Sequence, residues 1–249
     1  MSGHSKWSSI KHKKGREDAK RGKIFSKMAR YITVAAKEGG GDPNMNSALA
    51  NAIEKAKEYN MPADNIERAV KKGTGELAGV SYEHITYEGY GPGGVAILVD
   101  IMTDNRNRTA ADMRHIFTKH GGNLGTSGSV AWIFVKKGIV LVSKSENIDE
   151  EGLLNIVLDA GAEDLKAEDD HFEVVCEPGD LSNIKAALES EKIAYQSADI
   201  SMLPKEVIKP DASDARKLLK LMDLLEEHDD VQQVYANFDI SDELIEELA

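Results

Sequence analysis

Apolar residues recur every three or four positions along the first third of the chain, which is the spacing of one face of a helix. Over residues 17–37 they include Ile24 and Met28, and a run of three glycines then ends the pattern. The same spacing continues over residues 46–59 and 62–72. Three short helices that pack as a small bundle are therefore expected.

Beyond residue 80 the pattern becomes that of strands, because β-branched and aromatic residues gather in short runs beside glycines. The segment HITYEGYGPGGVAILVDIMTD predicts a strand, a Gly-Pro-Gly turn and a second strand. A helix is expected over NRNRTAADMRHIFTKHGG, and VAWIFV predicts one more strand.

Residues 138–203 follow the order β-α-β-β-α-β, which is the ferredoxin-like pattern. After Pro204 the chain adds a strand, a helix and a strand, which could complete the earlier sheet. We therefore predict an α+β fold with three domains. These are a basic arm plus a small N-terminal helical bundle (1–78), an α/β middle domain (79–137 and 204–249) and a ferredoxin-like domain inserted in it (138–203).

Composition excludes several classes of protein. The longest apolar run, VAILVDIM, is broken by Asp100 and is far shorter than the roughly 20 residues of a membrane span. The basic N-terminus is not followed by the apolar segment of a secretory signal. The single cysteine, Cys176, lies in an apolar strand-like run, where a buried thiol is expected rather than a nucleophile. These features predict a cytoplasmic protein without a membrane partner.

Charge is strongly segregated along the chain. Residues 1–30 have a net charge of +8, residues 75–249 have −20, and the whole chain has −12. Lysine and arginine attract phosphates, and Trp7 could stack on an unpaired base. A disordered solubilising tail is the alternative, although such a tail needs no tryptophan. The predicted nucleic-acid contacts are Lys6, Trp7, Lys11, His12, Lys13, Lys14, Arg16, Lys20, Arg21, Lys23, Lys27 and Arg30.

The loop GGNLGTSGS, residues 121–129, is a second candidate. Its glycines and hydroxyls could turn backbone N–H groups toward a phosphate. Composition alone favours the alternative, in which the glycines only let the backbone turn and the arginines are ordinary surface residues. The residues of this candidate phosphate contact are Arg106, Arg108, Arg114, Thr126 and Ser127.

Motifs for catalysis and cofactors are missing from the sequence. The stretch GYGPGG matches a dinucleotide-binding pattern, but a strand follows it where that site needs a helix, so a hairpin is expected. The seven histidines form no metal-binding spacing. We therefore expect no enzyme activity, no cofactor, no metal and no small-molecule substrate.

Four segments closely resemble the YebC-type family: GHSKWSSIKHKKGREDAKRGKIFSK, MPADNIERAVKKGTG, YEGYGPGGVAILVDIMTDNRNRTAADMRHIF and GGNLGTSGSVAWIF. The resemblance is specific to about residue 137 and looser beyond it. It implies a helical N-terminal domain and two α/β domains, one of them ferredoxin-like. It also implies cytoplasmic bacterial proteins called probable transcriptional regulators, for which DNA binding is reported. Mitochondrial relatives activate translation of cytochrome c oxidase subunit I, and bacterial relatives are linked to relief of ribosome stalling.

Three functions remain open on this basis. A DNA-binding transcriptional regulator agrees with the family label, and the helix at 62–72 offers Asn65 and Arg68 to a groove, although Asp64 and Glu67 would repel phosphates. A translation factor that binds ribosomal RNA or the ribosome would need no base-reading helix. A protein-binding scaffold that acts through its acidic domain is the third.

Overall fold

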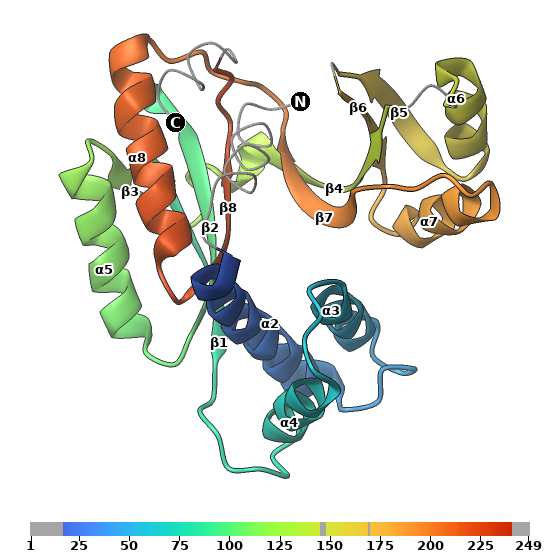
Figure 1. The fold of residues 1–249 in the computed structure, drawn as a ribbon. Coiled ribbons are helices and arrows are strands. Elements are labelled where there is room, and N and C mark those ends of the chain that lie inside the picture. The colour runs from blue at the N-terminus through green and yellow to red at the C-terminus, as the bar shows by residue number, and fades with distance from the viewer. Residues whose placement is uncertain (1–16, 145–147, 169, 241–249) are drawn as a thin grey trace.

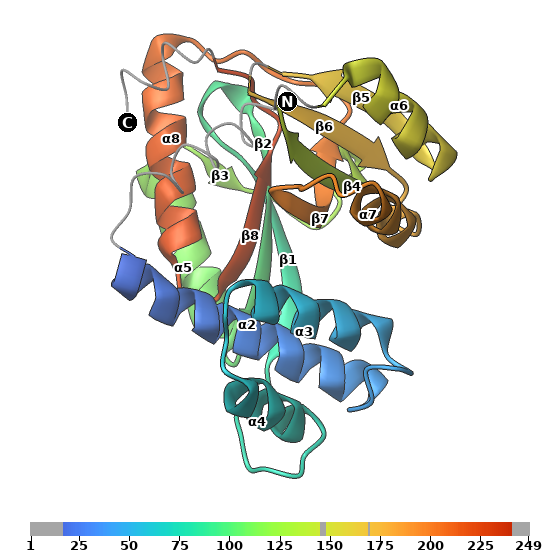
Figure 2. The same cartoon turned by 45° about the vertical axis from the view of Figure 1, so that its right-hand side comes forward.

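The computed structural model describes residues 17–144, 148–168 and 170–240. Two views show a helical part, a sheet covered by two helices, and a second sheet with its own pair of helices (Figures 1 and 2). The α+β fold with three domains is confirmed.

The helical part confirms the three predicted helices. They are α2 (Glu17–Gly39), α3 (Ser47–Glu58) and α4 (Ala63–Gly73). Their apolar faces form the core, in which Ile32 and Leu49 are fully buried.

Two local features hold the three helices in place. The Asn46 side chain accepts a hydrogen bond from the Leu49 N–H at 3.1 Å and so caps the start of α3. A Cβ atom on Gly73 would lie 2.4 Å from the carbonyl oxygen of Thr33. Helices α2 and α4 can therefore approach this closely only because residue 73 has no side chain.

The middle domain is an antiparallel sheet in the order β3-β1-β2-β8. Its elements are β1 (Glu83–Tyr90), the 3₁₀ turn η1 (Pro92–Gly94), β2 (Ala96–Thr103), α5 (Arg106–Lys119), β3 (Asn123–Leu124), α8 (Ala212–Glu227) and β8 (Val231–Ala236). The predicted hairpin is confirmed, and Gly93 and Gly94 make its turn with φ angles of +72° and +76°.

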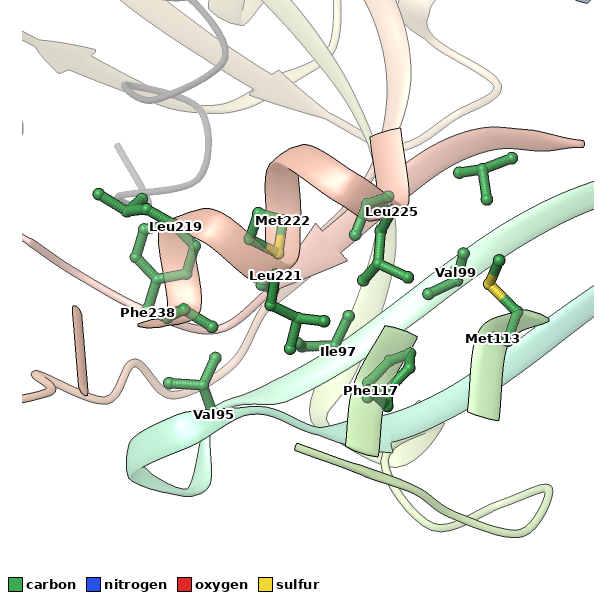
Figure 3. Close-up of a cluster of buried hydrophobic side chains, with 14 of the residues drawn as sticks. Val95, Ile97, Val99, Met113, Phe117, Leu219, Leu221, Met222, Leu225 and Phe238 are labelled. Atoms are coloured by element: carbon green, nitrogen blue, oxygen red, sulfur yellow. The ribbon is translucent and has the colours of Figure 1, made fainter. Parts of the chain in front are cut away.

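Helices α5 and α8 cover one face of this sheet, and the main core lies between them and the strands (Figure 3). Ile97 and Val99 of β2 meet Phe117 of α5 and Leu221 of α8 there. The opposite face buries Leu98 against the start of the second sheet. Because β2 is buried on both faces, its sequence is an almost unbroken apolar run.

The second sheet has the order β5-β6-β4-β7, which is the ferredoxin-like arrangement. Its elements are β4 (Phe134–Ser143), α6 (Glu150–Asp159), β5 (Ala162–Ala167), β6 (His171–Cys176), α7 (Leu181–Ser190) and β7 (Ser197–Pro204). Cys176 is fully buried, and this burial raises the pKa of its thiol.

Two predicted strands are wrong. The segment VAWIFV is not a strand of the first sheet: Ala131–Ile133 form a 3₁₀ turn, η2, and Phe134 begins β4 of the second sheet. After Pro204 the structure has a single bridge between Ile208 and Phe238 instead of a strand. Strand β8 does join β2, as predicted, so the ferredoxin-like domain is an insertion.

Candidate nucleic-acid interface

The predicted basic arm is only partly within the described structure. Helix α2 contains the backbone of Lys20 and Arg21, and the structure describes the side chains of Lys23, Lys27 and Arg30. The arm contacts Lys6, Trp7, Lys11, His12, Lys13, Lys14 and Arg16 lie outside the described residues. Their contact with nucleic acid stays a prediction.

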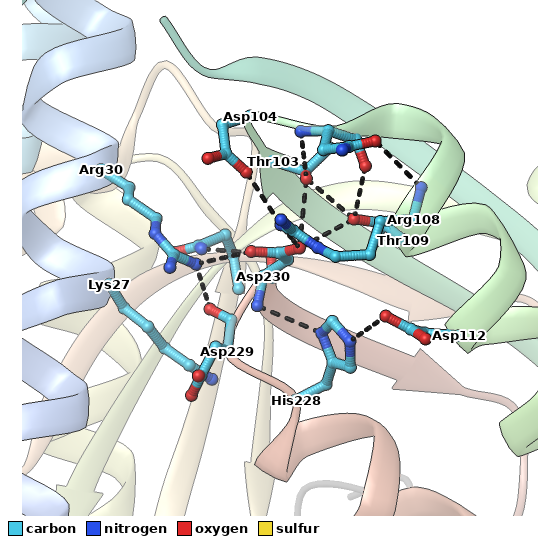
Figure 4. Close-up of polar contacts among 12 residues, drawn as sticks. Lys27, Arg30, Thr103, Asp104, Arg108, Thr109, Asp112, His228, Asp229 and Asp230 are labelled. Carbon is cyan, nitrogen blue, oxygen red and sulfur yellow. Dashed lines mark hydrogen bonds and ion pairs between the residues drawn. The ribbon is translucent and has the colours of Figure 1, made fainter. Parts of the chain in front are cut away.

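Lys23, Lys27 and Arg30 face the carboxyl end of helix α8 and the residues directly after it. Figure 4 shows Lys27 and Arg30 in this position. Lys23 Nζ donates to the Glu227 carbonyl and Lys27 Nζ to the Glu226 carbonyl, each at 3.2 Å. The last turn of α8 has no basic residue of its own. Because the end of a helix carries partial negative charge, three cations of α2 stabilise it from another domain.

Asp230, directly after this helix end, is the centre of the polar network in Figure 4. Its side chain is buried, and its Oδ2 accepts hydrogen bonds from Thr109 at 2.7 Å, Arg108 at 3.0 Å and Thr103 at 3.1 Å. Arg30 Nη1 donates to Oδ1 at 3.2 Å. One carboxylate therefore joins α2, β2, α5 and the start of β8.

Four further contacts complete this network, two of Arg30 and two of His228. Arg30 also donates to the Asp229 carbonyl, and its guanidinium lies 5.4 Å from the ring centre of Tyr82. The His228 ring accepts a hydrogen bond from the Asp230 N–H at 3.2 Å through Nδ1, which leaves Nε2 to donate to Asp112 at 3.4 Å.

A polar hollow of about 610 Å³ lies at this junction. Its lining contains Lys23, Arg30, Tyr82, Asp104, Arg108, Glu227, His228, Asp229 and Asp230. The acidic side chains would repel a phosphate, and the cations are engaged within the protein. The junction is thus suited to joining domains. A phosphate could bind Lys23 and Arg30 only by displacing the carbonyls and the carboxylate that they contact within the protein.

The hydrogen bonds at Asp230 predict an acid-sensitive contribution to stability. Burial alone would raise the pKa of this carboxyl, but the bonds from Thr109, Arg108 and Thr103 and the charge of Arg30 outweigh burial and lower it. A lowered folded-state pKa gives stabilisation that is complete above the unfolded value of about 3.9 and is lost as the pH falls through the folded value.

The expected result is a stability difference between wild type and Asp230→Asn that is constant from about pH 7 to 5 and shrinks below about pH 4. Urea unfolding at a series of pH values measures it. A difference that stayed constant down to about pH 3 would contradict the lowered pKa.

The end of the loop at residues 121–129, together with the two residues after it, turns three backbone N–H groups inward. The Glu88 carboxylate accepts hydrogen bonds from the N–H groups of Gly128 at 2.6 Å, Val130 at 2.7 Å and Ala131 at 2.8 Å. Burial raises the pKa of Glu88, but these three bonds outweigh burial and hold it below its ordinary value. An internal carboxylate thus occupies the place that the sequence suggested for a phosphate.

The other predicted loop residues are not gathered at one point. Thr126, Ser127, Arg106 and Arg114 are exposed. Arg106 and Arg108 begin α5, whereas the loop follows its end, about 20 Å away along the helix axis. Arg108 instead binds Asp230, and Asp104 at 2.8 Å. Arg106 and Arg108 therefore lie at the end of α5 far from the loop, and contact of these residues with a phosphate stays a prediction.

Two features of this region were missed from the sequence. Trp132, expected within a strand, lies on η2 with 67% of its surface exposed. The second is the environment of His120, in which burial lowers the pKa and the nearby Lys119, Lys220 and His115 lower it further. The run of glycines and serines shortly before Trp132 is the feature of the sequence that could have indicated a turn in place of a strand.

A cleft of about 600 Å³ separates the helical domain from both sheets. Two ion pairs span it between the helical and ferredoxin-like domains: Lys55 with Asp199 at 2.6 Å and Lys185 with Glu54 at 2.5 Å. Within the described ranges, no group of three or more His, Cys, Asp or Glu side chains is placed to hold a metal ion. No helix among the residues described is long and apolar enough to cross a membrane.

Two family models match this chain. The model for the TACO1/YebC protein N-terminal domain matches residues 5–76, and the model for the TACO1/YebC second and third domain matches residues 82–238. Both matches confirm that the sequence resembles the YebC-type family.

Curated relatives and a solved structure agree over nearly the whole length. Proteins named "Probable transcriptional regulatory protein" from Natranaerobius thermophilus and Rubrobacter xylanophilus are 57% and 58% identical, with 99% and 100% of both chains covered. A crystal structure of a conserved hypothetical protein from Aquifex aeolicus is 48% identical with a TM-score of 0.82, and covers 94% of this chain and 96% of that one. The chain belongs to the TACO1/YebC family.

Proposed function

We propose that this protein is a non-enzymatic, cytoplasmic regulator of gene expression that binds nucleic acid, in the first place a DNA-binding transcriptional regulator. The observation that carries the proposal is the separation of charge, +8 over residues 1–30 against −20 over residues 75–249. A phosphate backbone is attracted to the first region and repelled by the net charge of the second, so the main electrostatic contact is expected at residues 1–30. The names of the relatives support a regulator.

A translation factor that binds ribosomal RNA is the second candidate, and helix α4 favours it. Arg68 is exposed on α4, but Asp64 and Glu67 are exposed on the same short helix. Glu67 also pairs with Lys71. A helix with this charge balance is a poor reader of a DNA groove, whereas recognition of RNA by shape requires no such helix.

The salt dependence of binding tests the proposed contact. If about five phosphates are bound, log K against log[salt] should slope by roughly −4.5 on duplex DNA or −3.5 on a single strand. Reversing the charge of Lys11, Lys13 and Lys14 should flatten this slope by roughly two to three units, because fewer counterions are released when fewer phosphates are contacted. Fluorescence anisotropy with labelled DNA and RNA measures it.

A matched control reverses three exposed lysines of the acidic region, Lys166, Lys209 and Lys217, with the same change in net charge. This control should keep the slope. If both triple variants flatten the slope equally, net charge alone governs binding and the arm is not the contact. If deletion of residues 1–16 leaves affinity for DNA and RNA unchanged, a protein-binding scaffold becomes the better function.

Cross-linking in cells then separates the two nucleic-acid functions. Reads at promoter DNA that depend on the arm would support the transcriptional regulator. Reads concentrated in ribosomal RNA would favour the translation factor.

A further inference from the structure

Trp132 is a large apolar ring held in an exposed position. It is 67% exposed, whereas Phe134, two residues later, is 5% exposed. The indole Nε1–H donates to the Ser129 carbonyl at 3.1 Å, which fixes one edge of the ring. Tryptophan is enriched at binding interfaces, because its ring buries a large apolar area against a partner and its N–H finds a hydrogen-bond acceptor.

The segment beneath the ring is anchored from below. The buried carboxylate of Glu88 holds the backbone N–H groups of Gly128, Val130 and Ala131, directly before Trp132. The Tyr90 hydroxyl donates to the same Ser129 carbonyl that receives the indole N–H, at 3.0 Å. The ring therefore stands on a support that is already ordered without a ligand, which lowers the entropy cost of binding.

The segment of the chain that contains Trp132 is basic, which favours a polyanion. The chain has 43 acidic residues, yet none occurs between Asp112 and Glu146. This interval contains five basic residues, Arg114, Lys119, Lys136, Lys137 and Lys144, of which Lys137 is already paired with Glu163 and Glu177. Lys205 adds another cation close to the ring, since its Nζ donates to the Trp132 carbonyl at 2.8 Å.

The small polar residues before the ring favour a nucleic acid over a protein partner. Residues 125–129 are glycines, serines and a threonine, and Thr126 and Ser127 are exposed. A protein-binding hot spot is usually enclosed by other residues that exclude water. A single exposed ring beside hydroxyls and lysines is instead the arrangement of a stacking platform for a base next to its phosphates.

We propose that Trp132 stacks on an unpaired base of a single-stranded nucleic acid, with Thr126, Ser127 and Lys205 positioned for the adjacent phosphates. This inference rests on the proposed function and adds a second contact, distinct from the basic arm. Stacking needs an open π-face, so the site discriminates single strands from duplexes and tolerates many sequences.

The two tryptophans of the chain permit a direct test. In full-length Trp7→Phe, Trp132 is the only fluorescent indole, and a single-stranded RNA of about 12 nucleotides should quench it, because a stacked base lies against the ring. The same RNA annealed into a duplex, and the corresponding duplex DNA, should leave the emission nearly unchanged. Single-stranded DNA is the further probe that tests whether the sugar matters.

Affinity provides the second readout. Trp132→Ala should weaken binding of the single-stranded RNA by about five- to a hundredfold, the range for loss of one stacked base. Trp132→Phe retains a ring and should keep most of the affinity, and duplex DNA should bind Trp132→Ala as it binds wild type. Because the ring is exposed, the thermal midpoint of both variants should stay close to that of wild type.

The outcomes separate this inference from the proposed function. If single-stranded RNA binds wild type and Trp132→Ala equally while deletion of residues 1–16 weakens binding, the inference is wrong and the function stands. Equal losses on duplex and single strand would also overturn stacking. If wild type binds neither DNA nor RNA, both fail.

Discussion

Asp230→Ala is expected to lower the free energy of unfolding by about 3 kcal/mol. The variant removes one buried carboxylate and leaves the hydroxyls of Thr103 and Thr109 without their acceptor. It also leaves Arg30 and Arg108 without their shared counter-charge. The loss of both sets of bonds should weaken the junction between helix α2 and the middle domain, which urea unfolding at pH 7 measures.

The neighbouring residue supplies the control. Asp229 is exposed, and only its backbone carbonyl accepts a hydrogen bond from Arg30. Asp229→Ala removes the same chemical group one position away and should change stability by less than about 0.5 kcal/mol. Equal effects of the two variants would show that the total charge at the end of α8 matters and the buried hydrogen bonds do not.

Glu88→Ala is expected to destabilise the protein by a similar amount, about 3 kcal/mol, because three backbone N–H groups lose a charged acceptor. The effect should concentrate at residues 128–131, where hydrogen exchange should become faster than in the core strands. Emission from Trp132 in a Trp7→Phe background should also change, since its support is lost.

Glu83, at the exposed start of the same strand, gives the matched control. Glu83→Ala removes a carboxylate from β1 without removing an acceptor for buried N–H groups, and should leave both stability and exchange near wild type. Faster exchange in Glu83→Ala at residues 128–131 would contradict the specific role of Glu88.

The elements that depend on local sequence were predicted well. The helices α2, α3 and α4 follow from apolar spacing, and glycines end α2 and α4. The hairpin at η1 follows from its glycines and proline. The segment VAWIFV failed because its apolar residues suit a strand and a 3₁₀ turn equally. The hydrogen bonds that Val130 and Ala131 donate to Glu88, more than 40 positions earlier, favour the turn.

The candidate site was harder to predict for the same reason. A basic stripe on α2 is visible in the sequence, but its partners at the end of α8 lie about 200 residues away. A run of lysines cannot show whether it faces a phosphate or a helix carboxyl end, because both are negative. Glu88 likewise looks like an ordinary strand residue until its buried environment is known.

The insertion of the ferredoxin-like domain fixes an order of assembly during synthesis. Strands β4 to β7 are contiguous in the chain, so their sheet can close as soon as residue 204 has left the ribosome. Strand β2 must wait for β8, and its apolar residues Ile97 and Val99 must wait for α8. The nascent middle domain therefore keeps an open sheet edge and an uncovered core until nearly the whole protein has been translated.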